Sequence, residues 1–166
     1  MKTSAAKKRK SWQEKLADSK GLPKVETIAE RMTKNWGSGT MVVPAPLEVD
    51  ALMRQIPQGK VATINELRAA LARKHRVNIA CPLTTGIFAW IAAHAAEEAA
   101  AAAGNEQRTP WWRTLKAGGM LNPKYTGGGE TQAQLLAAEG HRLLPAQGKR
   151  PPRVADYEKA LYAELK

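Results

Sequence analysis

The stretch Ile56-Pro57-Gln58-Gly59-Lys60-Val61-Ala62-Thr63-Ile64-Asn65-Glu66 decides how the centre of the chain folds. Its proline and glycine predict a turn. Thr63, with Glu66 three positions later, forms a capping-box pattern that predicts the start of a helix. We therefore expect one helix before the turn, over residues 47–55, and a second helix after it that ends near His75.

Apolar spacing supports both helices and predicts a longer third one. The inward-facing residues that we expect are Leu47, Ala51 and Leu52 on the first helix, and Leu67, Ala70 and Leu71 on the second. After a linker over residues 77–82, the third helix starts near residues 83–86. It continues through an alanine tract to residue 103, because alanine has the highest helix propensity, and Gly104-Asn105 ends it. A helix, a turn, a capped helix, a linker and a further helix is the order of a helix-turn-helix unit.

The flanking regions carry weaker signals. We expect a disordered basic arm over residues 1–10, two short helices on either side of residues 21–23, and an extended segment at 41–43. The pairs with helical spacing are Trp12 and Leu16, and Ile28 and Met32. Towards the end of the chain we expect a helix over 130–138 and a basic, proline-stiffened loop over 147–153. Asp156 is expected to cap a last helix that carries Tyr157, Leu161 and Leu165.

The charge predicts the class of partner. The chain of 166 residues has a formal net charge of +11, which favours a polyanion, most often nucleic acid. No apolar run reaches the length of a membrane span, and no apolar signal segment follows the basic start, so we expect a cytoplasmic protein. The single cysteine, Cys81, excludes an internal disulfide and a multi-cysteine zinc site. The histidines make no metal-ligand spacing, and we expect no cofactor and no metal.

Adjacent tryptophans between Pro110 and Arg113 mark the segment in which we expect function. A glycine pair and an Asn-Pro step follow, which is typical of a specifically shaped loop. Trp111 has two open interpretations: a wall on which a base stacks, or a core residue that fills a pocket. For Trp112 and Arg113 we favour structural roles, and a buried Trp112 would need a partner for its N–H group.

Four segments in order are similar to the DNA-binding domain of the alkylguanine-DNA alkyltransferases. They are residues 56–67, 110–113, 118–122 and 135–141, within a resemblance that spans about Pro46 to Leu144. The resemblance implies a mainly α, winged helix-turn-helix-like DNA-binding domain. We expect it to cover residues 41–166, after a basic helical N-terminal extension over residues 1–40.

The resemblance also shows where this chain departs from the family, whose members move an alkyl group from guanine to a cysteine in a Pro-Cys-His-Arg motif. Trp111 stands at the position of the cysteine, Trp112 at that of the histidine, and Glu139 at that of the supporting acid. Indole cannot replace the attacking thiolate. Alkyltransferase-like proteins also carry tryptophan at the cysteine position, but they keep the histidine. The predicted lesion-pocket residues are Pro110, Trp111, Trp112, Arg113 and Tyr125.

The same resemblance assigns DNA contacts. Ile64 stands at the position of a tyrosine that turns the target phosphate, and Leu83 at that of an arginine that fills the gap left by the flipped base. An apolar side chain can also wedge between bases. Thr84 and Thr85 either cap their helix or donate to phosphate. The predicted DNA-contacting residues are Leu83, Thr84, Thr85, Ile64, Lys60 and Arg68.

We therefore expect a non-enzymatic DNA-binding protein that senses alkylated guanine in DNA repair. Its predicted partners are double-stranded DNA and repair proteins, and we expect a monomer associated with the nucleoid and not with a membrane. Two alternatives stay open: a general nucleic-acid or protein-interaction module whose lesion pocket is filled, and an alkyltransferase that uses Cys81 as its nucleophile.

Overall fold

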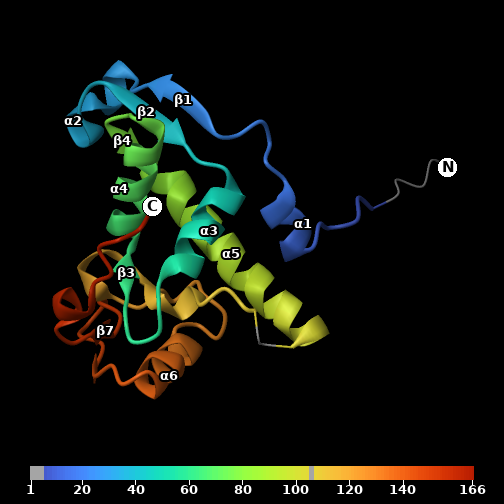
Figure 1. The fold of residues 1–166 in the computed structure, drawn as a ribbon, viewed down its shortest axis with the longest axis vertical. Helices are drawn as coiled ribbons and strands as arrows, with labels where there is room; N and C mark the ends of the chain where they lie inside the picture. The colour runs from blue at the N-terminus through green and yellow to red at the C-terminus, as the bar shows by residue number, and fades with distance from the viewer. Residues whose placement is uncertain (1–5, 105–106) are drawn as a thin grey trace.

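The computed structural model describes residues 6–104 and 107–166, and it is a mainly α-helical fold built around one long helix (Figure 1). This helix, α5 (Pro82–Ala103), crosses the molecule, and three others pack against it: α1 (Trp12–Ala17), α3 (Pro46–Gln55) and α4 (Ile64–His75). The remaining α-helices of the described residues are α2 (Thr33–Trp36) and α6 (Glu130–Ala138). No helix there is both long and apolar enough to cross a bilayer.

The predicted helix-turn-helix order is confirmed by α3, α4 and α5. The Thr63 hydroxyl accepts a hydrogen bond from the Asn65 N–H at 3.2 Å, and the Glu66 carboxylate accepts one from the Thr63 N–H at 2.6 Å. These bonds satisfy N–H groups at the start of α4, which is the purpose of a capping box. At the other end of α4, Arg76 adopts a left-handed conformation with φ 55°, and the chain turns towards α5.

Short strands join the helices in three small sheets. The first has the order β1-β2-β4, in which β2 (Thr40–Val43) pairs antiparallel with β1 (Lys24–Thr27) and parallel with β4 (Ile79–Ala80). The second pairs β3 (Ala62–Thr63) with β5 (Thr114–Leu115) in parallel, and the third pairs β6 (Leu143–Leu144) with β7 (Arg153–Val154) antiparallel. Short 3-10 turns complete the fold: η1 (Glu30–Met32), η2 (Trp111–Arg113), η3 (Ala117–Gly119) and η4 (Tyr157–Ala160).

The N-terminal region is only partly helical, which corrects one prediction. A helix begins at Trp12 as expected, but residues 24–27 form strand β1, and the helical spacing of Ile28 and Met32 yields only η1 and α2. Pairing with β2 determines the conformation of residues 24–27, because a strand partner can override weak local spacing. Of the predicted basic arm, residues 1–5 lie outside the described residues, whereas residues 6–10 are exposed and form neither helix nor strand. Asn105, predicted to help end the third helix, also lies outside the described residues.

Helix α1 is held on α5 by polar and aromatic contacts. The backbone N–H groups of Trp12 and Gln13 each donate to the Glu98 carboxylate at 3.1 Å, so a side chain of α5 satisfies the first turn of α1. The Trp12 ring stacks on His94 with ring centroids 4.4 Å apart and lies edge-on to Trp90 at 4.9 Å. Residues of the N-terminal region therefore pack directly on α5.

Two further expectations are wrong in detail. On α3, Leu47 and Ala51 are exposed, and the face that packs on the core consists of Val49, Leu52 and Met53. Both faces have helical spacing, and the orientation of α3 against α5 selects between them. Asp156 adopts φ 51° and caps nothing with its side chain, so the tail forms η4 instead of an α-helix. The tail is held by two backbone hydrogen bonds with Val61: the Ala160 carbonyl accepts from the Val61 N–H, and the Tyr162 N–H donates to the Val61 carbonyl.

Candidate nucleic-acid interface

The paired tryptophans lie in the core and not on the surface. Trp111 is 0% exposed and Trp112 is 9% exposed, with their rings edge-to-face and their centroids 6.0 Å apart. The Trp111 Nε1–H group donates to Glu97 of α5 at 2.7 Å, and the Tyr125 ring lies edge-on to Trp111 at 5.5 Å. The segment is therefore built like a hydrophobic core with its polar atoms satisfied.

This burial bears on the predicted lesion pocket. Trp111 has no accessible surface, and Pro110 and Tyr125 are also buried. A base could stack on Trp111 only after this segment moved, so in this structure the ring fills volume. The assignment of Pro110, Trp111, Trp112, Arg113 and Tyr125 to a lesion pocket stays a prediction.

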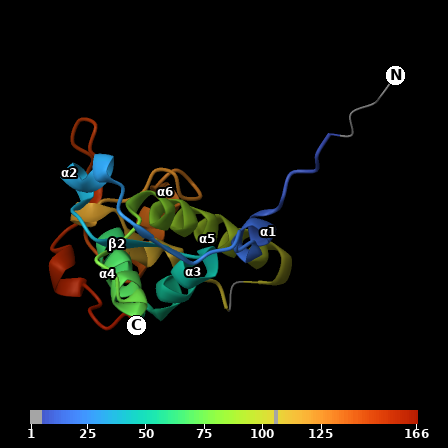
Figure 2. The ribbon, with the colours of Figure 1, turned by 90° about the horizontal axis from the view of Figure 1, so that it is seen from above.

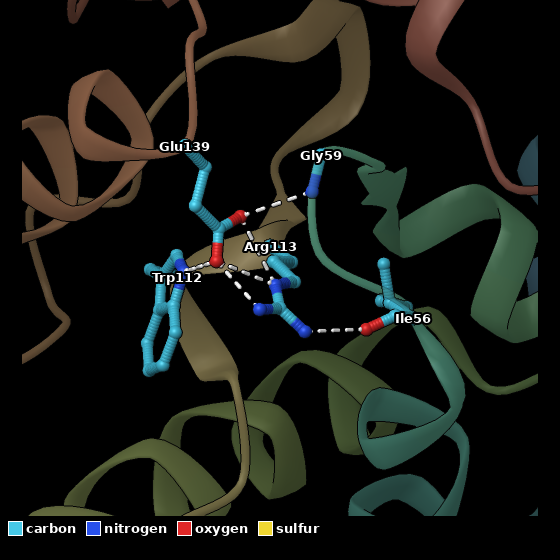
Figure 3. Close-up of polar contacts among 5 residues, drawn as sticks. All are labelled: Ile56, Gly59, Trp112, Arg113 and Glu139. Atoms are coloured by element: carbon cyan, nitrogen blue, oxygen red, sulfur yellow. Dashed lines mark hydrogen bonds and ion pairs between the residues drawn. The ribbon is translucent and has the colours of Figure 1, made fainter.

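The Glu139 carboxylate is the centre of a hydrogen-bond cluster that joins three parts of the chain (Figure 3). Its Oε1 atom accepts from Trp112 Nε1 at 3.0 Å and from Arg113 Nη2 at 2.5 Å, while its Oε2 atom accepts from Arg113 Nε at 3.1 Å and from the Gly59 N–H at 3.5 Å. Arg113 Nη1 also donates to the Ile56 carbonyl at 2.8 Å. The structural role predicted for Arg113 and the partner expected for the Trp112 N–H are confirmed.

Opposing effects in this cluster act on the pKa of the Glu139 carboxyl. Burial of Glu139 would raise the pKa of its carboxyl, but hydrogen bonds from Arg113 and Trp112 and the Arg113 charge outweigh that effect and hold the pKa below its usual value. Nearby, burial lowers the pKa of His141. Glu139 is thus a stably ionised anchor, whereas a carboxyl that exchanges protons with a base would need its pKa near the working pH.

We predict that this anchor makes stability sensitive to acid. A carboxyl whose pKa is lower in the folded than in the unfolded protein stabilises the folded state. This stabilisation is complete when the pH is above the ordinary pKa of 4.5, and it is lost as the pH falls through the lower pKa of the folded state. Urea unfolding between about pH 6 and pH 3 should show the free energy of unfolding falling with pH. The Glu139→Gln variant should have a shallower fall over the same range, and superimposable slopes for the two proteins would contradict this prediction.

A surface cleft lies beside the start of α5. It has a volume of about 740 Å³, and its residues are Pro82, Leu83, Gly86, Ile87, Trp90, Lys116, Asn122, Pro123 and Lys124. Leu83 is 66% exposed and Ile87, one helical turn later, is 48% exposed. Exposed apolar side chains on one helix, opposite two lysines, suit a partner with flat apolar faces and a charged backbone, as nucleic acid has. We call this the α5 cleft.

The predicted DNA-contacting residues differ in how exposed they are in the structure. Leu83 and Lys60 are exposed, and Thr84 and Ile64 are partly buried. Thr85 is 0% exposed and its hydroxyl donates to the Cys81 carbonyl at 2.7 Å, so the predicted contact is corrected: Thr85 belongs to the core. Arg68 is half-buried, donates to the Ala80 carbonyl at 3.1 Å, and has a pKa lowered by burial, which indicates a structural position.

Of the α5 cleft, sequence reasoning assigned only Leu83, and it missed the other exposed apolar residue and both lysines. Ile87 could have been found, because it follows Leu83 at the i+4 spacing that places two side chains on one helix face. Lys116 and Lys124 gave no local signal, and they reach the cleft only because the segment after β5 folds back towards α5.

Cys81 does not belong to the tryptophan cluster. It is 6% exposed and packs with Ile28 and Met41 in a hydrophobic cluster separate from the one that contains Trp111. It is the only cysteine of the sequence. The chain therefore has no thiol beside the tryptophans.

A family model and a solved structure are similar to this chain. Residues 45–141 match the family model described as 6-O-methylguanine DNA methyltransferase, DNA binding domain. Among solved structures, S. pombe Atl1 in complex with damaged DNA containing O6-carboxymethylguanine is similar with a TM-score of 0.48 and 19% sequence identity, covering 70% of this chain and 93% of that chain. No curated protein sequence matches the chain.

Proposed function

We propose that this chain, which belongs to the family of 6-O-methylguanine DNA methyltransferase DNA-binding domains, binds duplex DNA containing alkylated guanine and leaves the alkyl group in place. The proposed DNA-binding surface rests on one observation, the α5 cleft. Leu83 and Ile87 are exposed there, and Lys116 and Lys124 line the same cleft. In this proposal the α5 start enters a groove, Leu83 wedges at a base step, and the lysines contact phosphates. Exposed Lys60 would lie near the backbone, whereas the Thr84 hydroxyl is buried and would not reach it.

The absence of alkyl transfer is proposed from the chemistry of the tryptophan pair. Transfer needs a nucleophile that attacks the alkyl carbon while the guanine leaves, and a thiolate serves this purpose whereas an indole does not. Here each indole N–H is occupied by a carboxylate, Glu97 for Trp111 and Glu139 for Trp112. Cys81 is buried in another cluster. Bound but unrepaired lesions would remain available to repair proteins.

A second candidate function is DNA binding without preference for a lesion. It is favoured by the complete burial of Trp111, which leaves no open surface for a base at that position. Equal affinities for duplexes with and without O6-methylguanine would support this candidate, whereas tighter binding of the alkylated duplex would support lesion recognition.

The experiment that tests the proposal is a titration of both labelled duplexes by fluorescence anisotropy. Leu83→Ala should weaken binding about tenfold, or about 1.4 kcal/mol, because the wedge is lost. Leu47→Ala is the matched control: Leu47 is 53% exposed but lies on α3, outside the α5 cleft, so the affinity should not change.

Two results would overturn the proposal. The first is equal affinity of the Leu83→Ala variant and the unsubstituted protein, which would exclude the α5 cleft as the binding surface. The second is an alkyl adduct, detected by mass spectrometry after incubation with alkylated duplex. An adduct on Cys81 would establish the enzymatic alternative.

A further inference from the structure

The chain continues beyond the matched family segment into a basic hairpin over residues 143–154. Strands β6 and β7 pair Leu143 with Val154 and Leu144 with Arg153. Near the tip, the Gln147 N–H donates to the Arg150 carbonyl at 3.1 Å and the Arg150 N–H donates to the Gln147 carbonyl at 2.9 Å. The hairpin is thus defined by backbone hydrogen bonds, although the sequence predicted only a stiff loop.

The base of the hairpin is fixed to the segment that follows the tryptophan pair. The Leu121 N–H donates to the Pro152 carbonyl at 2.9 Å, and Met120 forms a bridge with Arg153. Next to these contacts, Gly119 has a φ of 78°, and a Cβ atom there would clash with the Tyr157 ring of η4, so η3 is also packed against the segment that follows the hairpin. The hairpin therefore has a defined position relative to η3.

A cleft of about 370 Å³ separates the hairpin from η3. Its residues are Gly118, Met120, Leu144, Pro145, Gln147, Arg150, Pro151 and Arg153. Arg150 and Arg153 are exposed, as is Lys149 at the tip, and in residues 6–104 and 107–166 no carboxylate lies within 4.0 Å of these three cations. By contrast, the guanidinium groups of Arg54, Arg108 and Arg113 are each paired with a carboxylate. The hairpin cations are therefore available to an anion from outside.

The hairpin cleft and the α5 cleft are both lined by residues of the segment around η3. Lys116 is part of the α5 cleft and Gly118 is part of the hairpin cleft, so the two share the turn around η3. In the view from above, the hairpin is the red loop that projects from the body of the molecule at upper left (Figure 2). A single turn of the chain thus connects the surface proposed to bind DNA with the basic hairpin.

We propose that this hairpin is a second DNA-backbone contact, in which Arg150 and Arg153 bind a phosphodiester group in the hairpin cleft and Lys149 binds a neighbouring phosphate. Guanidinium groups suit this ligand because their planar N–H groups match phosphate oxygens. The inference rests on the proposed function. Since phosphate contacts carry no base information, the hairpin should add the same affinity to plain and alkylated duplexes.

The test compares the salt dependence of DNA binding in two triple variants of the full chain. Each neutralised phosphate contributes about 0.9 to the slope of log K against log salt, and the proposal has the hairpin neutralise two phosphates, so Lys149→Gln/Arg150→Gln/Arg153→Gln should reduce the slope by about 2 between about 50 and 200 mM NaCl. The control, Lys20→Gln/Lys34→Gln/Lys159→Gln, removes the same charge at exposed residues that lie outside both clefts and have no carboxylate partner among the described residues. Its slope should stay close to that of the unsubstituted protein.

The outcomes separate the two proposals. If the unsubstituted protein binds DNA but the hairpin variant keeps its slope, or if the control loses as much, the hairpin contact is excluded and DNA binding stands. If the unsubstituted protein binds neither duplex, both proposals fail. A slope loss confined to the hairpin variant and equal for the two duplexes supports the backbone contact.

Discussion

Trp111→Ala is expected to lower the free energy of unfolding by about 3–5 kcal/mol, the range for removing a large aromatic side chain from a packed core. Trp111 has no exposed surface, contacts the rings of Trp112 and Tyr125 edge-on, and donates to Glu97. Removing the indole would leave a cavity and an unpaired carboxylate oxygen together. Urea denaturation monitored by circular dichroism measures the change.

Trp111→Phe is the control for this result. It retains most of the aromatic volume and loses the hydrogen bond to Glu97, so we expect a loss of about 1–2 kcal/mol. A loss below about 1 kcal/mol for the alanine variant would contradict the burial of this segment. If the alanine variant also gained a preference for the alkylated duplex, the opened space would be a base pocket that the native indole fills.

Glu139→Gln is expected to cost about 3 kcal/mol, because it removes the charge partner of a largely buried guanidinium. The side chains of Arg113 and Glu139 are 14% and 9% exposed, so water can hardly compensate the unpaired charge. The amide could still accept from Trp112, but not as an ionised partner of Arg113. The measurement is the urea-unfolding free energy at neutral pH.

An exposed ion pair in the same protein provides the comparison. Arg142 and Asp156 lie 3.9 Å apart with both side chains more than half exposed. Asp156→Asn should therefore change stability by less than about 0.5 kcal/mol, as is usual for surface pairs. Similar losses in the two variants would show that the Glu139 cluster is no stronger than a surface pair.

The parts of the fold that were predictable carry their signal within a few residues. The capping box at Thr63 and Glu66, the alanine tract of α5 and the apolar spacing of α6 all depend on neighbours within one or two helical turns. Strand β1 has its partner about 15 residues away, and pairing of that kind leaves little trace in local spacing. The buried face of α3 is likewise decided by α5, which follows much later in the chain.

The same distinction applies to the candidate site. The resemblance placed Trp112 and Glu139 at matching positions, and the structure shows that the indole N–H reaches that carboxylate. Lys116 and Lys124 could not be assigned, because their position depends on the fold of the segment after β5. Thr85 was misassigned because a helix start predicts available N–H groups but not which side chain turns inwards.

The two indoles donate hydrogen bonds to different carboxylates, Glu97 on α5 and Glu139 after α6. Each tryptophan therefore links η2 to another part of the fold. A cysteine at residue 111 would remove a central packing residue and its bond to Glu97, and a histidine at residue 112 would remove the indole that packs edge-on against Trp111 and donates to Glu139. Either substitution alone therefore costs stability. Selection for a stably folded protein would oppose both of them.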